Sequence, residues 1–178
     1  MWYITAIRMA GILLTLAASS ALGVYLSNIY TFRRQDLLEL KKALLILKSE
    51  IEYLAAPLTE AAANIAAKTT GPVSQLFANF AETLSHNTEN ETAYHLWLAA
   101  IEASKKDTFL NKEDIDTIAG FGKTLGYLDK QLQTEAIRLT ISYIDAQITE
   151  LQENSQKTSR MYKSLGVISG FLLLVIFW

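Results

Sequence analysis

The sequence contains no cysteine, which excludes a disulfide scaffold, a thiolate nucleophile and a cysteine-type zinc site. It contains two prolines, Pro57 and Pro72, and each stands where one helix can end and the next can begin. No segment alternates between polar and apolar residues for long enough to suggest a half-buried strand. The lack of strand-like alternation, together with the placement of the prolines, predicts an all-α fold.

Charged residues are scarce at both ends of the chain. All 18 acidic residues lie between Asp36 and Glu153, residues 1–32 carry only Arg8, and residues 164–178 carry no charge. Residues 35–160 therefore hold 12 basic and 18 acidic residues, a formal charge of −6. Nucleic-acid binding depends on basic contacts that release counterions, so we expect no nucleic-acid partner.

The two apolar ends predict membrane spans. Residues 9–32 have the length of a transmembrane helix behind a short tail of residues 1–8, and residues 164–178 form a second apolar run. A secretory signal peptide is the alternative for the first run, because Arg8 precedes it and residues 17–21 are small. Basic residues follow the first run and precede the second, so residues 33–163 are predicted to be cytoplasmic and both termini outside the cell.

Residues near the membrane invite two further predictions. A basic collar would face anionic lipid; its members are Arg33, Arg34, Lys157, Arg160 and Lys163. Small residues four apart, Gly166 with Gly170 and Ser19 with Gly23, allow two helices to approach closely in lipid. The first pair could pack against the other span, support self-association through a partner's span, or simply face lipid.

Apolar spacing in the middle of the chain predicts a bundle of six helices, flanked by the two transmembrane helices. Leucine and isoleucine recur at spacings of three and four from Leu37 to Leu54, and again from Ile137 to Leu151. The last helix runs without a turn signal from about residue 128 into the second apolar run. Thr88 and Glu91 have the spacing of a capping box for the fourth helix, and Asn111 is placed to cap the fifth.

No group of residues has the pattern of an active site. Gly122, Lys123 and Thr124 match the end of a Walker A loop, but Thr117 occupies the position of its first glycine and a helix replaces the strand that should precede it. The two histidines lack flanking ligands, so we expect no metal and no cofactor. The acidic pairs Asp114 with Asp116 and Glu50 with Glu52 diverge on a helix and are predicted to be solvated. The chain is not expected to be an enzyme.

The order of several short stretches resembles the stage III sporulation protein AB family along essentially the whole chain. These stretches are Arg33–Arg34, Leu44 to Pro57 (LLILKSEIEYLAAP), Thr70 to Phe77 (TGPVSQLF), Gly120 to Asp129 (GFGKTLGYLD) and Arg160 to Gly166 (RMYKSLG). The family pattern FGxxLGxxD is met by Phe121, Gly122, Leu125, Gly126 and Asp129. The family's helical domain is in turn distantly similar to the F protein, the inner-membrane platform of type II secretion and type IV pilus systems, which carries two such domains and an extra span.

The resemblance implies a non-enzymatic membrane platform in the channel complex that joins the mother cell and the forespore during endospore formation. It implies a location in the mother-cell membrane around the forespore. The implied partners are the ATPase called stage III sporulation protein AA and other stage III channel proteins. A membrane-anchored helical sensor or regulator that responds to a ligand is the alternative. Such a sensor would need an apolar cavity with converging polar groups.

Overall fold

A computed structural model describes the backbone of residues 3, 29–54, 56–87, 91–126 and 129–177, with side chains as far as residue 154. The chain divides into two compact units, residues 1–31 with 151–178, and residues 32–150. The described residues contain six α-helices and no strand, so the predicted all-α fold is confirmed for them.

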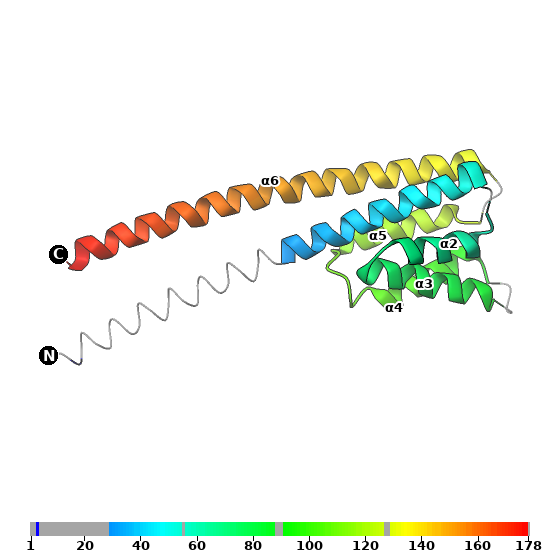
Figure 1. Ribbon diagram of the computed structural model, residues 1–178, viewed down its shortest axis with the longest axis horizontal. Coiled ribbons are helices and arrows are strands. Elements are labelled where there is room, and N and C mark those ends of the chain that lie inside the picture. The colour runs from blue at the N-terminus through cyan, green and yellow to red at the C-terminus, as the bar shows by residue number, and fades with distance from the viewer. Residues whose placement is uncertain (1–2, 4–28, 55, 88–90, 127–128, 178) are drawn as a thin grey trace. The chain divides into compact units, whose positions relative to one another are not determined.

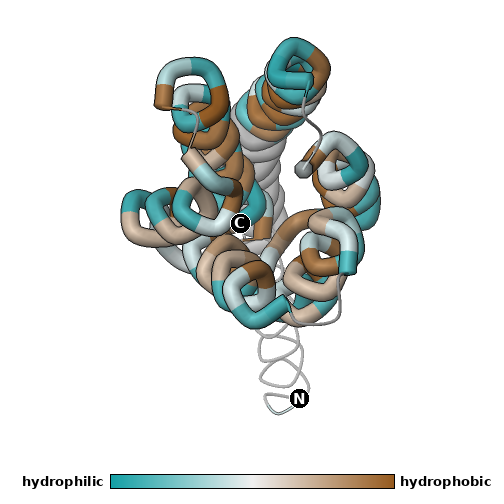
Figure 2. Tube along the Cα trace, turned by 90° about the vertical axis from the view of Figure 1, so that its right-hand side faces the viewer, coloured by the Kyte–Doolittle hydropathy of each residue, from teal (hydrophilic) through white to brown (hydrophobic). Residues whose placement is uncertain are grey.

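The helices follow one another with short connections (Figure 1). The first covers residues 29–49 and continues into a π-helical turn, Glu50–Leu54. The remaining elements are α2 (Leu58–Lys68), α3 (Gly71–Ser85), α4 (Ala93–Ser104), α5 (Lys112–Phe121), the 3₁₀ turn Gly122–Thr124, and α6 (Lys130–Phe177). Each helix of the bundle carries both hydrophobic and hydrophilic residues along its turns (Figure 2), as expected where one face is buried.

Most of the first predicted span lies outside the described residues, and so do the side chains of the second. Among the described residues, none of the helices is both long enough and apolar enough to cross a bilayer. Ser19 and Gly23 are not described. Gly166 and Gly170 lie within α6, but the side chains around them are not described.

The 29–49 helix buries the leucine face that the sequence predicts, since Leu37, Leu40 and Leu44 are each no more than 1% exposed. The stripe fails at its end, where Leu54 is 66% exposed. The π-helical turn, which includes Leu54, explains the difference. A π-helix has more residues per turn than an α-helix, so it rotates Leu54 away from the face that the α-helical spacing predicts.

That turn also buries an acidic residue. Glu50 is 5% exposed and accepts a hydrogen bond from the side-chain amide of Asn64 on α2, so the prediction of a solvated carboxylate is wrong there. Glu52 does pair with Lys48 near the surface, at 3.7 Å.

Caps fix where the later helices begin. The Asn111 side chain accepts from the Asp114 backbone N–H and the Asp114 carboxylate accepts from the Asn111 N–H, which is the cap predicted for α5. For α4 the predicted box is wrong: the helix begins at Ala93, and the Thr92 hydroxyl accepts from the His95 N–H at 3.3 Å. Thr88 lies outside the described residues.

Candidate functional site

The FGxxLGxxD stretch leads out of α5 toward α6, and its first residue joins an aromatic cluster. The Phe121 ring meets Trp97 of α4 edge-on, with ring centroids 6.1 Å apart. Trp97 also contacts Phe77 and Phe80 of α3, with centroids at 5.4 and 5.1 Å. All four rings are at least 95% buried, so the cluster ties α3, α4 and α5 together.

Gly122 lets Trp97 lie directly against the backbone. A Cβ atom at Gly122 would stand 2.0 Å from Trp97 Cδ1, which no real contact allows. The indole N–H of Trp97 donates to the Ile118 carbonyl at 2.8 Å, so this close approach also satisfies the polar atom of a buried ring. Gly122 is therefore required by packing.

The other members of the stretch turn the chain toward α6. Leu125 is 6% exposed, and Gly126 has φ +83°, a left-handed conformation that glycine tolerates best. Asp129 precedes α6, and its Oδ1 accepts from the N–H groups of Gln131 at 2.9 Å and Leu132 at 3.1 Å. Asp129 thus caps α6, a role that satisfies N–H groups with no partner in the helix.

A surface hollow of about 650 Å³ lies beside this turn. Its described lining comes from the start of α4 and from the segment after α5: Thr92, Ala93, Tyr94, Lys123, Leu125 and Gly126. The lining combines apolar groups with one lysine. Among the described lining residues, no two groups are arranged for proton transfer.

Apart from the hollow, a group of polar side chains joins three helices around Asp114, which is 1% exposed. Arg33 donates to both of its carboxylate oxygens, from Nε to Oδ2 at 2.8 Å and from Nη2 to Oδ1 at 3.0 Å. The Tyr143 hydroxyl donates to Oδ1 at 3.1 Å and the Asn111 N–H to Oδ2 at 2.9 Å. Four donors therefore fill the acceptor capacity of the buried carboxylate.

Arg33 extends this group to α6, since its Nη2 also donates to Gln147 Oε1 at 2.7 Å. The hydrogen bond and the negative charge of Asp114 raise the pKa of Arg33, although burial acts in the opposite direction. We name the group of Arg33, Asp114, Tyr143 and Gln147 the Asp114 clamp. It couples the 29–49 helix, α5 and α6.

The clamp changes two expectations from the sequence. Asp114 is buried rather than solvated, unlike Asp116, which is exposed. The side chain of Arg33 is 14% exposed and held by Asp114, so it does not offer its charge to lipid as the basic collar requires. Arg34 Nε is buried as well, with no hydrogen-bond partner. The side chains of the other collar residues, Lys157, Arg160 and Lys163, lie outside the described part.

Sequence reasoning missed the pairing because Arg33 and Asp114 are 81 residues apart. The signal available was the capping box, which identifies Asp114 as a residue with a structural task. Nothing in the spacing names its partner. Within the residues that the structure describes, no three acidic or histidine side chains gather at metal-binding geometry.

The clamp predicts a pH dependence through Tyr143, whose pKa is raised to about 12, first by burial and then by the charge of Asp114. The folded state thus holds this proton more tightly than the unfolded chain, where the pKa is about 10. The stability it contributes is present below pH 10 and is lost as the pH rises through 12. We expect Tyr143→Phe to cost about 1–2 kcal/mol at pH 7 and progressively less above pH 10, in urea unfolding followed by circular dichroism.

Tyr53→Phe is the matched control. Because Tyr53 is 79% exposed, we expect this variant to keep the free energy of unfolding of the wild type. A cost for Tyr143→Phe that stayed constant from pH 8 to pH 12 would contradict this assignment.

The chain has relatives along its whole length. A family model described as stage III sporulation protein AB matches residues 8–178. Stage III sporulation protein AB of Bacillus subtilis (strain 168) is 29% identical over 170 residues, which cover 96% of this chain and 98% of that protein. A solved structure of stage III sporulation protein AB (SpoIIIAB) is 27% identical, with a TM-score of 0.65, and covers 70% of this chain and 97% of the solved one.

Proposed function

Because the chain belongs to the stage III sporulation protein AB family, we propose that it is a non-enzymatic membrane platform of the channel complex between mother cell and forespore. Its bundle would dock cytoplasmic partners, among them the ATPase called stage III sporulation protein AA. Membership in the family supports a role in sporulation. The platform role rests on how the bundle continues into the rest of the chain.

The observation that carries the proposal is the continuity of α6. One helix runs from Lys130, which follows the cap at Asp129, to Phe177 in the uncharged run of the sequence. Buried Ile137 and Ile144 anchor its first part in the bundle. A single helix with a packed end and an apolar end can transmit position or force from a docked partner to a membrane.

We propose that residues 9–32 and 164–178 span the mother-cell membrane around the forespore, with the bundle in the cytoplasm and both termini outside. The chain has no cysteine, so single cysteines report topology without background. Tyr53→Cys, at a 79% exposed position in the bundle, is expected to resist an impermeant thiol reagent in intact cells. For this test the protein is expressed in the plasma membrane of vegetative cells, whose outer face meets the medium. A cysteine added after Trp178 is the control and is expected to react there. Labelling at position 53 in intact cells would overturn this topology.

The acidic surface of the bundle is the proposed contact for the ATPase. Glu113 and Asp116 are exposed on α5, close in sequence to the buried Asp114. We expect the double reversal Glu113→Lys with Asp116→Lys to abolish recovery of the ATPase after crosslinking and purification of the tagged protein from sporulating cells.

The matched control, Lys68→Glu with Lys130→Glu, reverses two exposed charges outside α5 by the same amount, so recovery of the ATPase should be kept. Both proteins must first show wild-type melting temperatures. Equal recovery with both variants would remove the acidic surface from the proposal. Failure to recover the ATPase with the wild-type chain would reject the proposal that the platform docks this ATPase.

A ligand-responsive regulator is the second candidate, and the hollow beside Lys123 is the observation that favours it. A small molecule that filled the hollow would raise the melting temperature by mass action. A thermal-shift screen of the full chain in detergent separates the candidates. The regulator predicts a compound that raises the melting temperature of the wild type but not of Lys123→Ala or Tyr94→Ala. The platform predicts no such compound.

A further inference from the structure

Two aromatic rings stack on the surface of the bundle without being buried by it. Phe32, in the 29–49 helix, and Phe109, between α4 and α5, have ring centroids 4.9 Å apart and planes at 26°. Phe32 is 43% exposed and Phe109 is 44% exposed. Two large rings that stay half exposed side by side make a small apolar patch, which suits contact with another surface.

The bundle holds this pair in place. Asp36, one turn after Phe32, is 7% exposed and its Oδ2 accepts from the Phe109 N–H at 2.7 Å. Burial raises the pKa of Asp36, so the protein tolerates an unfavourable burial at this contact. The Thr108 hydroxyl donates to the Lys105 carbonyl at 3.1 Å, which stiffens the same connection. The rings are therefore presented on fixed backbone.

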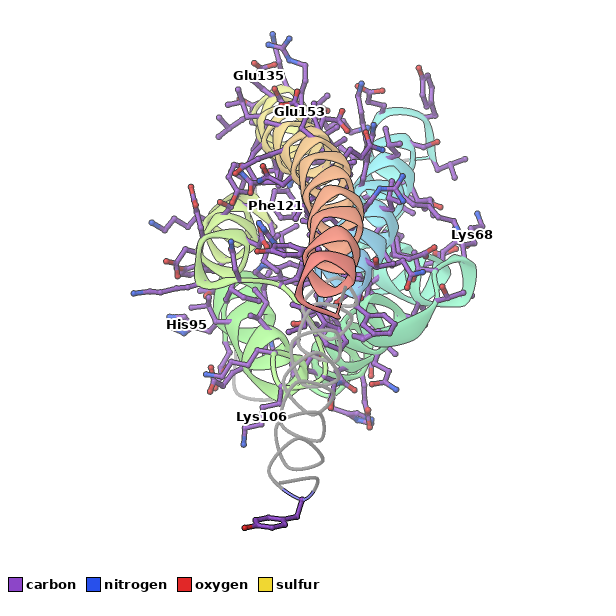
Figure 3. All side chains as sticks on the ribbon, turned by 90° about the vertical axis from the view of Figure 1, so that its left-hand side faces the viewer. Lys68, His95, Lys106, Phe121, Glu135 and Glu153 are labelled. Atoms are coloured by element: carbon purple, nitrogen blue, oxygen red, sulfur yellow. The ribbon has the colours of Figure 1, made fainter. Side chains whose placement is uncertain are left out.

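Basic side chains accompany the rings. Lys106 is exposed and projects outward from the connection between α4 and α5 (Figure 3). Lys112 is exposed at the first position of α5, two residues before the Asp114 that binds Arg33. Lys105 is 42% exposed but pairs with Glu102, so we assign the basic character of the region to Lys106 and Lys112, whose neighbours Asp107 and Glu113 are also exposed. We call Phe32, Phe109, Lys106 and Lys112 the aromatic-basic patch.

We propose that the aromatic-basic patch rests in the headgroup region of an anionic phospholipid bilayer. This inference deepens the proposed function and rests on its membrane anchor. Aromatic rings favour the interface between lipid and water, and lysines favour anionic lipid. The position of the patch in the chain agrees, because Phe32 is the last residue of the predicted span, residues 9–32. A bilayer that holds this span would come within a few residues of Phe32 along the chain.

The patch would fix the orientation of the bundle relative to the bilayer. The spans and the bundle can still tilt together, as one unit, relative to the bilayer. A rigid contact at a second point restricts that freedom and so orients the surface offered to cytoplasmic partners.

Spin labels on the full chain test the inference. Single cysteines at Asp107, Tyr53 and Leu173 place a nitroxide beside the patch, at the far end of the 29–49 helix and its π-helical turn, and in the proposed second span. The proteins are reconstituted in vesicles of equal parts phosphatidylglycerol and phosphatidylcholine, and collision with oxygen and with a water-soluble nickel chelate is measured. We expect position 173 to report lipid, position 107 the interface and position 53 water.

Matched variants connect the signal to the patch. Phe32→Ser with Phe109→Ser, in the Asp107→Cys background, is expected to move the label at position 107 into water. Leu38→Ser with Leu45→Ser is the control, because these residues are 39% and 48% exposed on the same helix, and no movement is expected. In pure phosphatidylcholine the wild-type patch should lose its contact.

Each contrary result has a separate meaning. Water at position 107 with lipid at position 173 overturns the patch and leaves the anchor standing. Water at position 173 overturns the anchor, and the inference falls with it. Equal depth at position 107 in pure phosphatidylcholine overturns the assignment to an anionic surface, and retention of depth in the double serine variant overturns the role of the rings.

Discussion

Arg33→Met is expected to lower the free energy of unfolding by about 3–5 kcal/mol, because it leaves a buried carboxylate without its counter-charge. Asp114 is 1% exposed and loses two of its four hydrogen-bond donors, while Gln147 loses its partner. Methionine keeps most of the side-chain volume, so the loss is electrostatic rather than a cavity effect. Urea unfolding of the full chain in detergent, followed by circular dichroism, measures it.

Lys41→Met is the matched control for the clamp. Lys41 pairs with Asp145 of α6 at 2.6 Å, so it also bridges the first and last helices, but the two side chains are 33% and 47% exposed. Exposed pairs contribute about 0–1 kcal/mol, and the control should lose no more than that. The double variant Arg33→Met with Asp114→Asn should recover part of the loss. Equal costs for Arg33→Met and Lys41→Met would show that Asp114 is not held as the structure has it.

Gly122→Ala is expected to cost about 3 kcal/mol, the upper part of the range for overpacked cores. The new methyl group would stand 2.0 Å from Trp97 Cδ1, so the indole must move. Movement breaks its bond to the Ile118 carbonyl and its contacts with Phe77, Phe80 and Phe121. The near-ultraviolet circular dichroism of Trp97 should weaken along with the stability.

Gly120→Ala, two residues away, is expected to raise the free energy of unfolding instead of lowering it. Gly120 lies in α5, and a Cβ atom there would meet nothing within 4 Å. Alanine in a helix interior is more favourable than glycine by about 0.5–1 kcal/mol, so this variant should be stabilised. Similar losses from the two substitutions would reject the special packing of Gly122.

These contacts bear on how the FGxxLGxxD stretch supports function. Phe121 and Leu125 are buried, Gly122 accommodates Trp97, and Asp129 caps α6. Their contacts lie inside the bundle, so we expect substitutions there to weaken partner binding only in proportion to lost folding. The exposed neighbour Lys123, at the rim of the hollow, is the position in this stretch that could touch a partner directly.

The sequence by itself determined the helical class and much of the core. Apolar spacing identified the buried faces of the 29–49 helix and of α6, because a 3.6-residue period places residues three and four apart on one face. Asn111 could be read as a cap, since capping depends on residues within one turn. The family was recognisable from the order of short stretches, and the comparisons confirm it.

Tertiary structure alone decided which charges are buried and what they bind. The sequence predicts a lipid-facing Arg33 and a solvated Asp114, yet the two side chains pair across 81 positions once the first helix and α5 pack together. The π-helical turn at Glu50–Leu54 and the stacking of Phe32 on Phe109 were equally invisible. The physical reason is the range of each effect: helix period and capping act within one turn, whereas charge burial and ring stacking depend on which segments the whole fold brings together.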